Sequence, residues 1–110
     1  MKSEIKTLLG FAQRAGKVIS GEVATRIQLS KRRKRRLKLL ILAEDTAPEV
    51  QRQYMALAQK QGVAMLVAGR KEELGLAIGK SPRAIVGIWD EHFARLIIEK
   101  ARETSTGPEI

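Results

Sequence analysis

Apolar residues occur along the chain in two patterns. In the first they fall every three or four positions, which is typical of an α-helix with one buried face. In the second they follow one another in short runs, which is typical of a strand covered on both faces of a sheet. The first pattern predicts helices over residues 3–15, from 20 or 21 to 31, 46–61, 71–78 and 90–101. The second predicts strands over residues 37–43, 63–68 and 84–89.

Residues that commonly begin and end helices support these boundaries. Ser3 and Asp90 are predicted N-caps, and Thr46 with Glu49 has the spacing of a capping box that places Pro48 in the first turn. Three of the helices are predicted to end at a glycine, namely Gly16, Gly62 and Gly79.

The alternation of helices with buried strands predicts an α/β fold, a three-layer α/β/α sandwich around a central mixed sheet of about four strands. A chain of 110 residues is long enough for one core and too short for two ordinary ones, so residues 1–102 are expected to form a single domain. Polar and helix-breaking residues fill 103–110, and this tail is predicted to be disordered.

Positive charge is concentrated in one stretch of this basic protein. The formal net charge is +9, and seven of the eight residues from 31 to 38 are cationic. Packed like charges repel one another, so an anionic partner explains why they are tolerated. We call these residues the basic block: Lys31, Arg32, Arg33, Lys34, Arg35, Arg36 and Lys38.

The composition favours RNA over other polyanions. The block has no interleaved aromatic anchors or lipidation site for a membrane surface. Aromatic residues are too scarce for base stacking to dominate, which leaves phosphate contact and shape recognition of a folded RNA. A nuclear localisation signal is the other interpretation of such a run. The absence of cysteine, of a signal peptide and of a membrane-length apolar run leads us to expect a cytoplasmic protein that does not enter membranes.

Residues able to carry catalysis are few. The single histidine, His92, falls in the first turn of a predicted helix, where a solvated role is the simpler interpretation. Glu44 and Asp45 follow a predicted strand, but a carboxylate at a helix entry also suits the positive end of the helix dipole. No catalytic triad, metal spacing or phosphate loop can be assembled, so no enzyme activity, metal or cofactor is expected.

Three segments stand in a familiar order and spacing: LLGFAQRAGKVISGE (8–22), LKLLILAEDTAPE (37–49) and KEELGLAIGKSPRAIVGIWDEHFA (71–94). Together they resemble the L7Ae and L30e type ribosomal protein family, and most closely its small bacterial members of the YlxQ type. The resemblance implies an α/β/α sandwich without catalytic activity that binds kink-turn RNA, an internal loop with tandem sheared G·A pairs. It also implies that a Gly-x-Asn-Glu-x-x-Lys motif at the second helix reads the G·A pairs, and that a late loop closes over the bulged base.

The chain departs from that motif at its base-reading positions. With Gly21 on the motif's glycine, the other three defined positions carry Val23, Ala24 and Ile27. A shifted register that puts Glu22 on the motif's glutamate leaves Gly21 at the asparagine position. The polar set is incomplete in both registers, and Arg26 is the neighbouring residue expected to reach a phosphate.

The candidate RNA-binding residues therefore fall in three groups: Gly21, Glu22 and Arg26 at the second helix, the basic block, and Lys80, Ser81 and Arg83 in the segment 78–84. The block holds about three residues more than the family pattern. We hypothesise that it lies on the rim of the RNA-facing surface and replaces base-specific readout by phosphate contact. For the segment 78–84, the alternative is a plain polar turn in which Pro82 fixes the bend.

The sequence thus favours a non-enzymatic, monomeric protein that recognises structured, kink-turn-like RNA, either ribosomal or associated with the ribosome. One alternative is a protein-interaction or assembly module that keeps the fold with only nonspecific RNA affinity. An enzyme that acts on a nucleotide substrate is the third interpretation.

Overall fold

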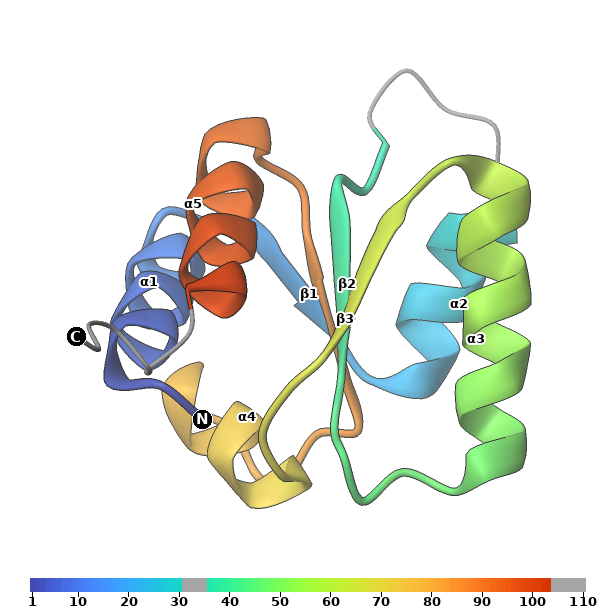
Figure 1. Ribbon diagram of the computed structural model, residues 1–110, viewed down its shortest axis with the longest axis horizontal. Coiled ribbons are helices and arrows are strands. Elements are labelled where there is room, and N and C mark those ends of the chain that lie inside the picture. Colours follow the sequence, from blue (N-terminus) through green and yellow to red (C-terminus); the bar gives the residue numbers. More distant parts are fainter. Residues whose placement is uncertain (31–35, 104–110) are drawn as a thin grey trace, which may run out of the picture.

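The computed structural model describes residues 1–30 and 36–103, and within them helices and strands alternate as predicted. In chain order the elements are α1 (Ser3–Arg14), β1 (Val18–Ser20), α2 (Glu22–Ser30), β2 (Leu39–Leu42), α3 (Pro48–Gln61), β3 (Ala64–Val67), α4 (Lys71–Ala77), β4 (Ile85–Ile88) and α5 (Glu91–Arg102). Helices α1, α4 and α5 cover one face of the sheet, and α2 and α3 cover the other (Figure 1). The predicted α/β/α sandwich is confirmed.

The sheet is mixed and has the strand order β1-β4-β2-β3. Strand β4 runs antiparallel to both of its neighbours, β1 and β2, whereas β2 and β3 are parallel. The fourth strand is β1, which the sequence marked only by the short apolar pair Val18 and Ile19. Because this strand has three residues and is half-buried throughout, it lacks the long apolar run that reveals the central strands.

Every residue of β2 and β4 is buried, which explains the continuous apolar runs. Successive side chains point to opposite faces of a sheet, so each strand supplies both cores. One core, beneath α1, α4 and α5, includes Leu39, Ile41, Val86 and Ile88. The other, beneath α2 and α3, includes Leu40, Leu42 and Ile85. Each buried aliphatic side chain contributes about 1.5–3 kcal/mol to this packing.

Two of the three predicted N-caps are wrong. Helix α3 begins at Pro48 with Ala47 as its N-cap, one residue after Thr46. Proline disfavours helical backbone in the residue before it, so Ala47 stays extended at ψ 138° and the capping box falls out of register. The Thr46 hydroxyl is buried and finds no hydrogen-bond partner among the described residues.

The first helix shows the same one-residue displacement, in the other direction. Lys2 is the N-cap of α1, and Ser3 is already helical. Lys2 is held in an extended conformation while its ammonium group donates to the Lys100 carbonyl at the end of α5, 2.6 Å away. Asp90 is confirmed as a cap, because its Oδ2 accepts from the Phe93 amide at 2.8 Å.

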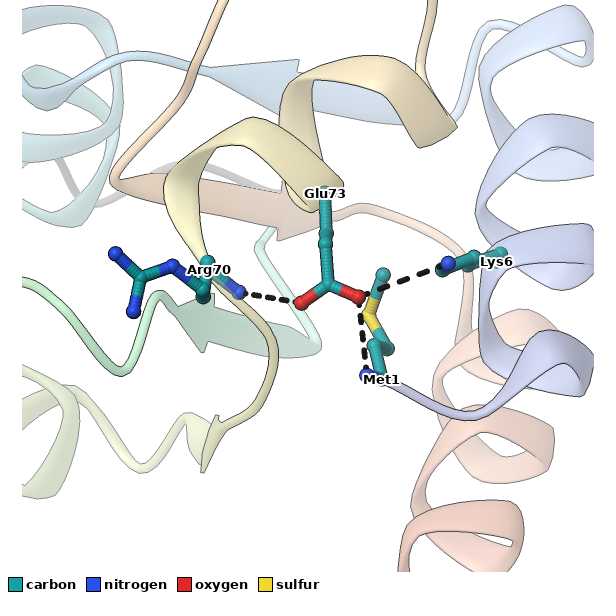
Figure 2. A network of polar contacts seen from close by, with 4 residues as sticks. All are labelled: Met1, Lys6, Arg70 and Glu73. Carbon is teal, nitrogen blue, oxygen red and sulfur yellow. Dashed lines mark hydrogen bonds and ion pairs between the residues drawn. The ribbon is translucent and has the colours of Figure 1, made fainter.

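Two carboxylates hold the first turn of α4. Glu73 Oε1 accepts from the Arg70 amide at 2.9 Å, and its Oε2 lies 3.1 Å from the Met1 ammonium group and 3.6 Å from Lys6 Nζ (Figure 2). Asp45 Oδ1 accepts from the Lys71 amide at 2.9 Å, so the structure supports a helix-entry role for this carboxylate. The position of α4 is therefore fixed from both α1 and the end of β2.

The carboxylate of Glu73 should make the free energy of unfolding depend on pH. Its hydrogen bond from the Arg70 amide, followed by the contact with the Met1 ammonium group, lowers the pKa of Glu73. A lowered pKa stabilises the fold fully above the unfolded value of about 4.3, and this contribution is lost as the pH falls through the folded value. Glu73→Gln should therefore unfold at a lower temperature than the wild type at pH 7, and the gap should narrow towards pH 3.

Thermal unfolding of both proteins between pH 7 and pH 3 measures that gap. Glu72→Gln is the matched control, since Glu72 is the exposed neighbour in the same helical turn and should change the unfolding temperature little. A gap for Glu73→Gln that stays constant across the range would show that ionisation of this carboxylate does not stabilise α4.

Candidate nucleic-acid interface

The end of β1 and the start of β4 lie side by side, and the chain turns there into α2. The Gly21 amide donates to the Ile85 carbonyl at 3.2 Å, and the Thr25 amide donates back to the Gly21 carbonyl at 3.1 Å. Gly21 has φ +97°, a conformation that side-chain-bearing residues rarely adopt. The glycine is required by this turn, which points the N-terminus of α2 outwards at the end of the sheet.

The first turn of α2 is fixed from α3. Tyr54, which is fully buried, donates its hydroxyl to the Glu22 carbonyl at 2.7 Å. Burial raises the pKa of Tyr54 above its usual value near 10, so the hydroxyl keeps its proton at neutral pH. The Arg26 guanidinium lies 5.6 Å from the centre of the Tyr54 ring and donates to Gln53 Oε1 at 3.3 Å. Arg26 is thus held against α3.

The outer face of α2 is more apolar than an RNA-reading helix would be expected to be. Val23 is 75% exposed and Ile27 is 45% exposed. With Glu22 and Arg26 they line a shallow, open hollow on the first two turns of the helix. With Gly21 on the motif's glycine, the positions that the family motif fills with Asn, Glu and Lys carry Val23, Ala24 and Ile27. All three are exposed to solvent.

The segment that connects α4 to β4 is folded tightly against α4. The Lys80 amide donates to the Gly75 carbonyl at 2.8 Å, and the Arg83 amide donates to the Lys71 carbonyl at 3.0 Å. A Cβ atom added to Gly75 would fall far inside contact distance of the Ser81 carbonyl oxygen and 2.9 Å from the Lys80 oxygen. We call residues 79–84 the α4–β4 loop; its backbone is seated on α4 at Gly75.

One side chain connects the α4–β4 loop to the turn before α2. Arg83 donates from Nε to Ser20 Oγ at 3.2 Å, across 63 positions of sequence. Its NH1 group donates to Ser81 Oγ at 2.6 Å and to the carbonyls of Ser81 and Pro82 at 3.2 and 3.3 Å. Two of the three predicted groups, the start of α2 and the α4–β4 loop, are therefore brought together at one end of the sheet.

The tip of the α4–β4 loop combines one cation with apolar surface. Lys80 is exposed and forms no ion pair with any residue in 1–30 or 36–103. Leu76 is 79% exposed and lines a second shallow hollow with Pro82 and Ser81. This end of the molecule thus offers a cation and several aliphatic groups to a ligand.

The described part of the basic block lies at the other end of the sheet. Its described members, Arg36 and Lys38, are exposed, and the Lys38 amide donates to the Ile88 carbonyl at the end of β4. Helix α2, whose nine residues span about 14 Å, separates Gly21 from the start of the block. Arg36 and Lys38 therefore do not border the surface around Gly21, and the hypothesis that the block lies on the rim of the RNA-facing surface stays a prediction. Residues 31–35 lie outside the described part of the chain, as do residues 104–110 of the predicted tail.

The described residues contain no group of three His, Cys, Asp or Glu residues placed to hold a metal ion. His92 is exposed on α5, where its Nδ1 lies 3.2 Å from Arg95 NH2. None of the helices in 1–30 and 36–103 is long and apolar enough to cross a membrane.

Sequence reasoning missed the contacts that assemble this surface. Ser20 drew attention only as a helix start, and Tyr54 only as an apolar position of α3. Both act on α2 through long-range hydrogen bonds, which no local spacing reveals. The one signal available was Tyr54 itself, because a buried tyrosine hydroxyl requires a partner.

Comparisons with known proteins agree with the fold. The sequence pattern of the ribosomal protein L7Ae/L30e/S12e/Gadd45 family matches residues 3–98. The RNA-binding protein YlxQ of Bacillus subtilis is 33% identical over 91 residues, which are 83% of this chain and 88% of that protein. A Bacillus halodurans protein of unknown function superposes with a TM-score of 0.84 at 25% identity, over 93% of this chain and all of the other. The Giardia lamblia 15.5kD RNA binding protein shares the fold, with a TM-score of 0.73 at 20% identity over 91% of this chain and 89% of the other.

The seat of the α4–β4 loop on Gly75 can be tested by adding one methyl group. Gly75→Ala should lower the free energy of unfolding by about 1–3 kcal/mol, because the Cβ atom forces the loop backbone away from α4. Gly10→Ala is the matched control: Gly10 is also helical, and its added Cβ would lie at an ordinary 3.5 Å from the Ala77 oxygen. The control should be neutral or stabilising by up to about 1 kcal/mol. Urea unfolding that ranks the two variants equally would contradict the close approach at Gly75.

Proposed function

The chain belongs to the ribosomal protein L7Ae/L30e/S12e/Gadd45 family, and from this premise we propose that it is a non-enzymatic RNA-binding protein that recognises structured, kink-turn-like RNA. The observation that carries the proposal is the meeting of the α2 N-terminus and the α4–β4 loop at one end of the sheet. These are the two places where the family resemblance puts its RNA contacts. The name of the Bacillus subtilis relative, an RNA-binding protein, supports the same ligand class.

The N-terminus of α2 supplies the first part of the ligand site. The first amide groups of a helix have no partner inside the helix and carry its positive partial charge. Backbone N–H groups aimed outwards bind phosphate oxygens and base acceptors without any charged side chain. Glu22 and Arg26 flank this end, and Gly21 allows a ligand to approach the backbone closely.

Contacts with the sugar and base faces replace the family's polar readout in this proposal. Val23 and Ile27 cannot read guanine edges, since they carry no donor or acceptor. They offer instead a hollow of aliphatic surface beside the helix N-terminus. Leu76 and Pro82, next to the loop tip, offer similar surface to an unstacked base, and Lys80 and Ser81 offer a cation and a hydroxyl. Recognition then depends on the bent shape of the RNA more than on base identity.

The basic block serves a different part of the same RNA in our proposal. Arg36 and Lys38 lie at the far end of the sheet from Gly21. The RNA phosphates that they contact therefore belong to a stem that continues past the bend. Contacts of this kind add affinity without sequence information and make binding depend on salt. We propose a monomer in the cytoplasm whose RNA is ribosomal or associated with the ribosome, for which the family is named.

Binding to a kink-turn RNA should exceed binding to a length-matched duplex without the G·A pairs, and the preference should persist as salt is raised. Shape and backbone contacts at the α2 N-terminus are screened less than phosphate contacts at exposed cations. Fluorescence anisotropy across a salt series measures both affinities. Equal binding that fades steeply with salt would leave nonspecific electrostatic binding, and no binding to either RNA would contradict the proposal altogether.

Two glycine variants test whether the preference for kink-turn RNA arises at the N-terminus of α2. Gly21→Val and Gly16→Val each force a β-branched residue into positive φ (+97° and +72°), and neither glycine has an atom within 4 Å of an added Cβ. Gly16 lies at the opposite end of the sheet, before β1. Only Gly21→Val should lose the kink-turn preference, because its side chain stands between the helix and the RNA.

Neutralising the block should weaken binding to all RNAs and flatten the salt dependence. The variant replaces Arg32, Arg33, Arg35 and Arg36 by Gln. Each lost phosphate contact removes roughly one unit from the slope of log affinity against log salt. The loss should be larger for a kink-turn with long stems than for one trimmed close to the bend, because the block is expected to contact a stem.

A second variant with the same loss of charge serves as control. It replaces four cations exposed on α3 and α5 by Gln, namely Arg52, Lys60, Arg95 and Arg102. The control should keep most of the affinity and slope. Equal losses in the two variants would assign the salt dependence to net charge, and an unchanged affinity in the first would remove the block from the interface.

A further inference from the structure

Arg83 is placed differently from the other cations near the candidate interface. Its side chain is half-buried, and its donors Nε and NH1 meet Ser20 Oγ, Ser81 Oγ and two loop carbonyls. Lys80, three positions earlier, is exposed at the tip of the same loop. The sequence made both residues candidates for RNA binding, yet four acceptors within the protein already engage Arg83.

The Arg83 contact with Ser20 spans the two helical layers. The α4–β4 loop is seated on α4, which lies on one face of the sheet, whereas α2 lies on the other (Figure 1). Ser20 is the last residue of β1 and immediately precedes the turn at Gly21. The bond from Arg83 therefore joins the loop to the entrance of α2 around the end of the sheet. The same guanidinium group also donates hydrogen bonds to the carbonyl and the hydroxyl oxygen of Ser81.

The planar guanidinium group suits this task. It presents its donors in a fixed fork, so one side chain can hold a hydroxyl on one element and several acceptors on another at defined angles. A lysine carries the same charge on a single rotatable ammonium group and cannot reproduce that fork. Geometry, and not charge alone, distinguishes Arg83 here.

We propose that Arg83 is a positioning residue that sets the spacing between the α4–β4 loop and the N-terminus of α2, and thereby the preference for bent over straight RNA. The inference rests on the proposed function, and it replaces the direct RNA contact that the sequence suggested for this residue. A loop held at a fixed distance before RNA arrives avoids the entropy cost of ordering it on binding. Loss of the bond should reduce affinity for the bent RNA and spare the duplex.

Four variants test this inference: Arg83→Gln, Arg83→Lys, Ser20→Ala and the double variant Arg83→Gln with Ser20→Ala. Each single variant should lower kink-turn affinity by at least about tenfold, the cost of one hydrogen bond to a charged group, with the salt slope unchanged. The double variant should be no weaker than Arg83→Gln, since Arg83→Gln already removes the one Arg83 contact that Ser20→Ala removes. Arg83→Lys should fail to restore affinity although it keeps the charge.

Lys80→Gln is the comparison for a phosphate contact. It should lower the salt slope by about one unit and combine additively with Ser20→Ala. A slope that falls with Arg83→Gln and is restored by Arg83→Lys would assign Arg83 to phosphate and overturn the inference. Additive losses from Arg83→Gln and Ser20→Ala, or no loss of affinity, would overturn it as well.

Amide hydrogen exchange in the free protein separates this inference from the proposed function. Arg83→Gln and Ser20→Ala should both speed exchange in residues 79–84 while the sheet core stays protected, whatever RNA the protein binds. If the wild-type protein shows no kink-turn preference, the proposed function is refuted. Faster loop exchange in both variants would still support the part of the inference in which Arg83 holds the loop in place. Unchanged exchange in the loop of both variants would refute the role of Arg83, even if the kink-turn preference is found.

Discussion

Strand β4 determines where a ligand site can form, because it pairs antiparallel with β1 on one side and with β2 on the other. This pairing puts Ser20, the last residue of β1, beside Val86, the second residue of β4, so the α4–β4 loop and the turn into α2 meet. The strand tolerates little change, since a Cβ atom at Gly87 would come within 2.8 Å of Ile19 Cγ2 and 3.0 Å of Leu37 Cδ2. The core and the candidate interface are thus fixed by the same strand.

The two ends of the sheet differ in chemistry. At one end the N-terminus of α2 provides partial positive charge from backbone amides, beside the exposed aliphatic side chains of Val23 and Ile27. At the other end the chain enters and leaves the basic block, which holds most of the net charge of +9. In our proposal the first end makes close, shape-dependent contact with the RNA, whereas the second makes looser contact with phosphates. A protein of this size can therefore divide specificity and general affinity between separate surfaces.

Local patterns in the sequence were enough to predict the layers, the central strands and the helices, because burial on both faces of β2 and β4 forces continuous apolar runs. They could not predict the caps near Pro48 and Lys2, where a backbone restriction and a long-range hydrogen bond each moved a helix start by one residue. The candidate site at Gly21 and in the polar loop 78–84 was located through the family resemblance and not through local patterns. The hydrogen bonds that hold the site together could not be predicted, since the bonds of Tyr54 and Arg83 join residues 32 and 63 positions apart. The orientation of Arg26 towards α3 likewise depends on packing between helices.

The most direct test of this account is to follow the backbone amide resonances of the full chain by NMR while a kink-turn RNA is added. The account predicts the largest shifts in two separate segments, residues 21–27 at the start of α2 and residues 79–84 in the α4–β4 loop, saturating together at one RNA per protein. Smaller, salt-sensitive shifts are predicted at Arg36 and Lys38. Shifts confined to α5 and β3, with both segments unchanged at saturation, would contradict the placement of the ligand at the β1–β4 end of the sheet.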